Sequence, residues 1–172
     1  MGRKIFFLTA LLSGLLTACN FNNDKRKSFE DVVVYNDFIV DHINALDSAY
    51  IIALDTDQGI EVCIKKCDSL VELCDRTTED FLGIQPFKGD SSLTMQALKY
   101  TQFMKNNGNK EIKALLKLID EYQNADYETQ EAMADEIEQS ANRIDARYDE
   151  EINKVDKVQT QLSKKFEFRV LK

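Results

Sequence analysis

The sequence predicts an all-α protein, an antiparallel up-down-up-down four-helix bundle with a bent third helix. Three observations support this prediction. The 172 residues contain only 6 glycines and 1 proline, too few for the frequent turns of a β-sandwich or barrel. Apolar residues recur at spacings of three and four over long stretches rich in charge, as they do in amphipathic helices. Short polar segments separate these stretches, which favours antiparallel neighbours.

Residues 1–18 have the features of a secretory signal peptide. Two basic residues precede an apolar run that is shorter than the ~20 residues a membrane-spanning helix needs. The run ends in four residues that resemble a bacterial lipobox, namely Leu16, Thr17, Ala18 and Cys19. The resemblance implies cleavage before Cys19, lipidation of its thiol and attachment of the mature chain to a membrane. The alternative is an ordinary signal peptide with an incidental cysteine.

Cleavage before Cys19 would leave 154 of the 172 residues and change the net charge from −8 to −10. Residues 19–27 are polar and aperiodic, and we expect them to tether the lipid to a helical domain over residues 28–172. No second apolar stretch of spanning length follows. The acyl chains, at ~0.8 kcal/mol per buried CH₂, are therefore the expected membrane attachment. The resemblance to lipoproteins also implies, under one common sorting rule, that Asn20 after the cysteine favours the outer membrane, on either its periplasmic or its surface face.

The first helix is expected to start at a capping box over residues 28–31, with Ser28 as the N-cap. Its apolar stripe contains Val32, Tyr35, Ile39, Ile43, Leu46, Tyr50 and Ala53. The turn-forming residues 55–59 end it. The stripe of the second helix contains Ile60, Cys63, Ile64, Cys67, Leu70, Val71, Cys74, Thr78 and Phe81.

Residues 83–90 form the most convincing loop, because they contain two glycines and the sole proline. A third helix is expected after it, with Asp90, Ser91 or Ser92 as its N-cap. Residues 106–109 predict a bend or a break in this helix, since Gly108 suits a left-handed C-cap, and we expect a bend. A turn at 124–126 precedes the fourth helix. Its stripe contains Met133, Ile137, Ala141, Ile144, Tyr148, Ile152, Val155, Leu162 and Phe166.

Two further segments carry a second resemblance. Residues 35–40 (Tyr-Asn-Asp-Phe-Ile-Val) and residues 87–93 (Phe-Lys-Gly-Asp-Ser-Ser-Leu) resemble a group of bacterial surface lipoproteins. That group is helical, envelope-anchored and of unknown function. The resemblance implies the fold and the location, and it implies no catalytic residue.

Three cysteines share one face of the second helix. Cys63, Cys67 and Cys74 are spaced by four and seven residues, which places them in its apolar stripe. Core packing by small, soft side chains is the first interpretation. A disulfide, a metal site and a redox role are the alternatives, although structural zinc requires four ligands and the chain has a single histidine, His42.

No catalytic or cofactor-binding pattern is evident. His42 lies at the edge of the first stripe without assembled partners and is expected to be structural. The acidic groups of the fourth helix favour a solvated face over a calcium site. No phosphate-binding glycine loop and no catalytic Ser/His/Asp set is readable. We therefore expect no enzyme activity, no cofactor and no metal.

The charge distribution predicts a basic pole next to the lipid. Residues 126–151 carry 10 acidic and 2 basic side chains, whereas residues 152–172 carry 6 basic and 2 acidic ones. In an up-down-up-down bundle the end of the fourth helix lies beside the start of the first. The pole then comprises Lys25, Arg26, Lys27, Lys164, Lys165 and Arg169, which suits anionic headgroups. The alternative is that these charges only serve the helix dipole and solubility.

Together these patterns predict a lipid-anchored cell-envelope protein that acts as a non-enzymatic interaction or structural module. Its partners are the membrane and an unidentified envelope or surface protein. The net charge of −8 argues against nucleic acid. The predicted contact loop contains Ile84, Pro86, Phe87 and Asp90, with Pro86 and Phe87 exposed. The alternative is a bundle that binds a small molecule or metal in its core, where buried tyrosine hydroxyls need partners.

Overall fold

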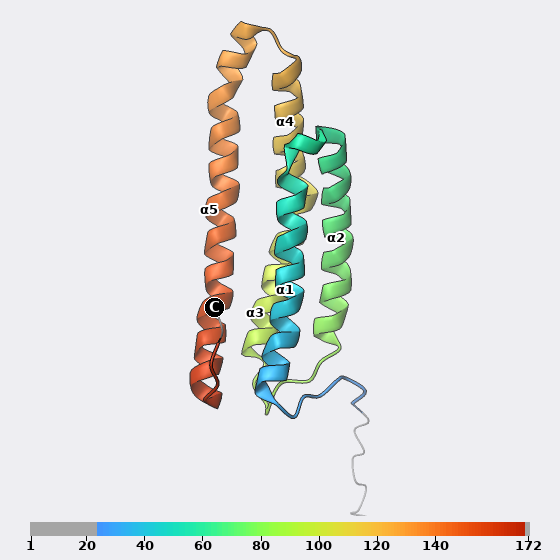
Figure 1. The fold of residues 1–172 in the computed structure, drawn as a ribbon, viewed down its shortest axis with the longest axis vertical. Coiled ribbons are helices and arrows are strands. Elements are labelled where there is room, and N and C mark those ends of the chain that lie inside the picture. The colour runs from blue at the N-terminus through green and yellow to red at the C-terminus, as the bar shows by residue number, and fades with distance from the viewer. Residues whose placement is uncertain (1–23, 171–172) are drawn as a thin grey trace, which may run out of the picture.

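The protein is all-helical in the computed structural model, which describes residues 24–170 and contains no β-strand in that range. The helices are α1 (Val32–Leu54), α2 (Ile60–Leu82), α3 (Ser92–Asn106), α4 (Ile112–Asn124) and α5 (Tyr127–Phe166) (Figure 1). A 3₁₀ turn (Thr56–Gln58) joins α1 to α2. The all-α prediction is confirmed. The predicted signal peptide, the predicted lipobox residues (Leu16–Ala18) and Cys19 lie outside the described residues.

The start of α1 differs from the prediction. Asp31, not Ser28, is the N-cap, and its carboxylate accepts hydrogen bonds from the amides of Val33 and Val34 at 2.7 and 3.1 Å. The reason lies upstream, because the amide of Lys27 donates to the carbonyl of Gly83 at 2.7 Å. That bond keeps the preceding segment out of the helix, and the short carboxylate of Asp31 then satisfies two free amides.

The third predicted helix is an uninterrupted helical run from Ser92 to Asn124. Between α3 and α4 lies a π-helical turn (Asn107–Glu111), at the position where the sequence predicts a bend or a break (residues 106–109). Gly108 has no left-handed φ. A Cβ at Gly108 would lie 3.0 Å from Cδ2 of Leu70. The glycine is therefore required by the close approach of this turn to α2 and not as a C-cap.

The helices contribute unequal numbers of buried residues to the core. α1 packs on α2 and α3, α2 packs on α3 and α4, and α5 packs on α3 and α4. Most of the first two stripes is buried as predicted, but Val32, Ile64 and Val71 are only partly buried, and Thr77 replaces Thr78 in α2. α5 differs, because its 40 residues include only three buried ones: Ile144, Val155 and Leu162.

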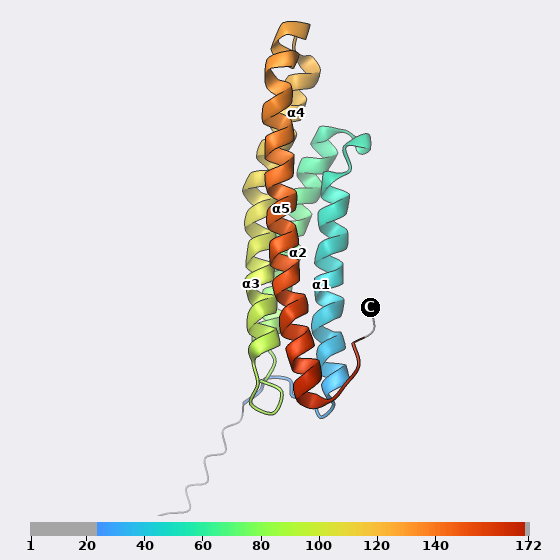
Figure 2. The ribbon, with the colours of Figure 1, turned by 90° about the vertical axis from the view of Figure 1, so that its left-hand side faces the viewer.

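The molecule is an elongated rod with two different ends. The run from α3 through α4 has 33 residues and α2 has 23, so α4 extends about 15 Å beyond the α1–α2 connection. The beginning of α5 lies beside this extension (Figures 1 and 2). We call residues 115–138 the tip. At the other end, residues 24–31, the 83–91 loop and the end of α5 come together; we call this the basal end.

Candidate functional site

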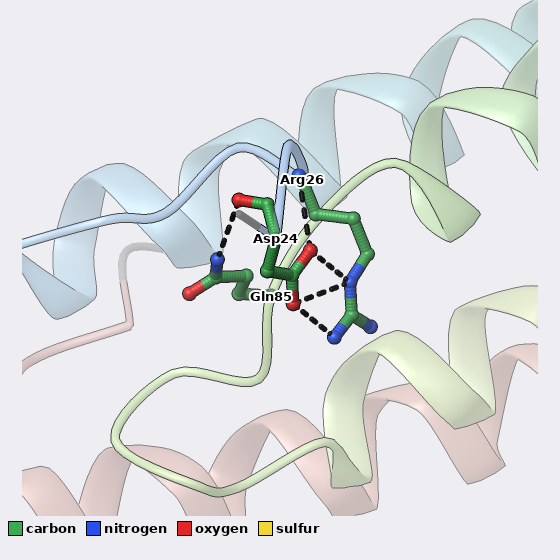
Figure 3. Close-up of polar contacts among 3 residues, drawn as sticks. All are labelled: Asp24, Arg26 and Gln85. Carbon is green, nitrogen blue, oxygen red and sulfur yellow. Dashed lines mark hydrogen bonds and ion pairs between the residues drawn. The ribbon is translucent and has the colours of Figure 1, made fainter. Parts of the chain in front are cut away.

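The basal end holds the described part of the predicted tether in place. Lys27 forms a short parallel bridge with Ile84, in which the Gln85 amide donates to the carbonyl of Lys27 at 2.8 Å. The Arg26 guanidinium binds the Asp24 carboxylate through Nε and Nη2, with contacts of 2.6–3.1 Å. The Gln85 side chain donates to the carbonyl of Asp24 at 3.5 Å (Figure 3). Residues 24–27 are therefore attached to the 83–90 loop.

The predicted contact loop is wrong in its apolar part. Phe87 and Ile84 are only 3 and 4% exposed. The Phe87 ring stacks on Tyr35 at 5.5 Å and meets Phe166 edge-on at 5.1 Å. Only Pro86 of the predicted apolar contacts lies on the surface. The loop closes the basal end of the core and does not offer Phe87 to a partner.

The predicted basic pole is partly neutralised within the chain. Arg26 pairs with Asp24, and Lys165 pairs with Asp90 at 2.6 Å. Burial raises the pKa of Asp90, but Lys165 and the Ser92 hydroxyl and amide outweigh it and hold that pKa at about 2. Lys27 lies over the Phe29 and Phe38 rings at 4.8 and 4.4 Å. The six residues therefore do not form a uniformly free cationic face.

Lys25, Lys164 and Arg169, the other three predicted members, are exposed. No ion pair is formed by them within residues 24–170.

A polar cluster lies between α1, α3, α5 and the π-helical turn. The Tyr100 hydroxyl donates a hydrogen bond to the carboxylate of Asp47. Tyr148 stacks on Tyr50 with ring centroids 4.9 Å apart and 13° between planes. Burial, and then the bond to Asp47, raises the pKa of Tyr100, so its hydroxyl remains a donor. Burial also raises the pKa of Asp47, and the hydrogen bonds from Tyr100 and Tyr148 only partly offset this.

Two members of this cluster are unsatisfied. The Tyr50 hydroxyl and both side-chain polar atoms of Asn107 have no hydrogen-bond partner among the described residues. Asn107, in the π-helical turn, is 3% exposed. Burial raises the pKa of the Tyr50 hydroxyl, and the neighbouring Asn107 side chain only partly offsets this. Unpaired buried polar groups are costly, and π turns recur at functional sites. The cluster is therefore the best candidate for an internal binding site.

Asp47→Asn is expected to flatten the acid side of the stability profile. Because the folded-state pKa of Asp47 is raised, ionising it opposes folding. Stability should therefore fall as pH rises from the unfolded value of about 4 through the folded-state pKa. The asparagine still accepts from Tyr100 and lacks this loss. Urea unfolding between pH 3 and 8 tests this against Asp41→Asn, an exposed change on the same helix. Parallel profiles for wild type and Asp47→Asn would contradict it.

The cysteines of α2 are buried in the core, and His42 lies partly exposed at its edge. Cys63, Cys67 and Cys74 are buried with free thiols. Burial raises the pKa of the Cys67 thiol to about 11 and that of Cys74 to about 12, which keeps both thiols protonated and poorly nucleophilic. The Nδ1–H of His42 donates to the Phe38 carbonyl at 2.7 Å, and its Nε2 lies 3.1 Å from Asp80.

The tip carries a groove between α4 and α5 that α1 and α2 are too short to cover. It encloses about 320 Å³ and is lined by Ile119, Tyr122, Gln123, Ala134, Ile137 and Glu138. Ile119, Tyr122 and Ile137 are only partly buried. The tip contains eight carboxylates and one basic residue, Lys117. None of the eight forms an ion pair within residues 24–170.

The sequence alone predicts some features of the polar cluster and of the tip. It identifies the tyrosines as buried groups that need partners, and it identifies the acidic run of α5. The sequence does not indicate that Asp47 and Asn107 belong to the polar cluster. Asp47 has the pattern of a solvent-facing neighbour of Leu46, and Asn107 that of a helix breaker. The groove is not predicted, because helix-length differences between α2 and the α3–α4 run become visible only in three dimensions.

Among residues 24–170, no group of three or more His, Cys, Asp or Glu side chains is arranged to hold a metal ion. No helix in the same range is long and apolar enough to cross a bilayer. Comparison of the chain with protein-family models, curated proteins and solved structures finds no match, so the resemblances of residues 16–19, 35–40 and 87–93 remain predictions.

Proposed function

We propose that this protein is a lipid-anchored cell-envelope module that works by binding a partner and not by catalysis. The observation that carries the proposal is the polarity of the rod. The chain enters the domain at the basal end, where residues 24–27 pair with the 83–90 loop. The unpaired acidic tip lies at the opposite end. A lipid on Cys19 would attach the basal end to a membrane and direct the tip away from it.

The proposal includes the finer architecture. The helices form an antiparallel up-down-up-down bundle, and the third helix bends at the π-helical turn. Short connections support this arrangement, because residues 55–59 join α1 to α2 and residues 125–126 join α4 to α5, and the joined helices pack on each other. The membrane is the outer membrane, and the partner is an envelope or surface protein.

Cys19→Ala is expected to abolish membrane attachment. The substitution removes the thiol that would carry the lipid, and the described helices include none able to span a bilayer. Wild-type protein should sediment with membranes and show the added mass of acyl chains on its N-terminal peptide. The variant should stay in the soluble fraction without that mass. Cys63→Ala, which removes a core thiol, is the matched control and should remain in the membrane. Equal sedimentation of Cys19→Ala and wild type would refute the anchor.

A second candidate function is small-molecule binding in the core, and the unsatisfied Tyr50 and Asn107 favour it. A polar ligand that bonds to both groups would raise the melting temperature by mass action. A thermal-shift screen of metal ions and small polar metabolites tests this. A true ligand should stabilise wild type and lose its effect in Asn107→Leu. Stabilisation of both proteins by the same amount would place binding elsewhere, and no stabilisation would remove this candidate.

A further inference from the structure

We propose that the groove at the tip binds a cationic amphipathic helix of a partner protein, about ten residues of which lie between α4 and α5. This inference rests on the proposed function and specifies the chemistry of its partner. Three features of the tip carry it: the missing helical layer, the apolar floor of the groove, and the concentration of negative charge around it.

The missing layer sets the kind of occupant and its length. The α3–α4 run is ten residues longer than α2, which corresponds to about 15 Å of helix, and this extension projects past the α1–α2 connection. Ile119 and Ile137 form the apolar floor there. A helix that continues the line of α1 or α2 would cover them, in the way that amphipathic helices occupy grooves through residues spaced by three and four.

The charge around the groove selects a cationic partner. Eight carboxylates and one lysine give the tip a charge of −7, almost the whole of the chain's net −8. Three of the carboxylates, Glu131, Asp135 and Glu138, are spaced by four and three residues and therefore share one face of α5 next to the groove. Unpaired charges of one sign attract a partner of the opposite sign and raise its association rate.

The same charge opposes the other occupants. A second copy would bring a second −7 tip against the first. An anionic membrane surface would be repelled. No metal site is formed among the described residues, and a free cation would leave the apolar floor uncovered.

The test uses the full chain in nanodiscs of neutral lipid and a fluorescent 15-residue peptide of leucine and lysine. The leucines recur at spacings of three and four and form one face of a helix, and the lysines form the other. Fluorescence anisotropy, corrected with empty nanodiscs, measures the affinity of this peptide. A scrambled peptide of identical composition reports charge attraction alone. We expect the amphipathic peptide to bind at least tenfold more tightly than the scrambled one and to weaken as salt is raised. Equal affinities for the two peptides would overturn the proposal that the groove binds an amphipathic helix. The absence of binding by either peptide would overturn it as well.

Two variants test the two features separately. Ile137→Gln should weaken binding about tenfold by removing apolar contact, whereas Ile51→Gln, at a site 64% exposed on α1, should not. Glu131→Gln/Asp135→Asn/Glu138→Gln should weaken binding and flatten its salt dependence. The matched control Glu61→Gln/Glu72→Gln/Glu79→Gln removes the same charge from α2 and should change binding less than twofold. If the α2 control variant lost as much affinity as the tip variant, the net charge of the chain would explain the binding, and the proposal would be overturned.

A photo-crosslinking residue at Gln123 in intact membranes separates this inference from the proposed function. Crosslinking to a basic amphipathic segment supports both. Crosslinking to a segment without basic residues overturns the inference and leaves the proposed function standing. The same residue placed at Ile51 is the control, and crosslinking from Ile51 alone would overturn the inference and leave the proposed function standing. No crosslinked protein from either position would overturn both.

Discussion

Replacing Phe81 by alanine should lower the free energy of unfolding by about 3–5 kcal/mol, the range for a fully buried phenylalanine. The Phe81 side chain is 1% exposed and is among the largest completely buried groups. Its ring centroid lies 5.4 Å from that of His42, so it joins the last turns of α2 to α1. Alanine would leave a cavity there and remove the ring that supports the histidine.

The neighbouring residue supplies the control. Leu82 follows directly in the same helix turn but is 61% exposed, so Leu82→Ala should cost no more than about 0.5 kcal/mol. Urea unfolding followed by circular dichroism compares the two variants with wild type. Similar losses for Phe81→Ala and Leu82→Ala would contradict the orientation of α2 in the bundle.

The helices could be predicted because their information is local. A stripe at spacings of three and four identifies both the helix and its buried face, which is why Tyr35, Leu46, Leu70 and Cys74 were correctly assigned to the core. Thr77 is buried where the stripe predicts Thr78. This error is local, because it shifts the buried position by one residue, or about 100° around the helix.

The errors concern residues whose surroundings come from elsewhere in the chain. Ser28 is a good N-cap by sequence, but the pairing of Lys27 with the distant loop moves the helix start to Asp31. Phe87 belongs to a loop with a proline and two glycines, which usually lies on the surface. Its ring is buried because Tyr35 and Phe166, from the two ends of the domain sequence, meet there.

The candidate sites also combine local patterns, which the sequence shows, with contacts between distant residues, which it does not show. The acidic composition of the tip is visible in the sequence, but its exposure depends on the unequal lengths of α2 and the α3–α4 run. The polar cluster needs residues 53 positions apart, Asp47 and Tyr100. No local pattern encodes that contact.

Val155→Asp should release α5 from the rest of the bundle. Val155 is 3% exposed and is the middle one of only three buried residues in α5. A carboxylate there would be buried without a partner, which costs about 3–5 kcal/mol. α1, in contrast, contributes seven buried residues over 23 positions. The loss should therefore be largest in α5, while α1 and α2 keep their mutual packing.

Limited trypsin digestion with mass spectrometry measures this release, because Lys154 and Lys157 flank the substituted residue. Cleavage at these lysines should accelerate more than about a hundredfold, since each 1.4 kcal/mol changes the open population tenfold. Thr160→Asp adds the same charge to an exposed position of the same helix and should change the rate less than about twofold. If both variants were cleaved at the same rate, charge on α5 would explain the effect. Val155 would then not hold the helix, and the docking of α5 would depend on the polar contacts of Asp47, Tyr100 and Tyr148.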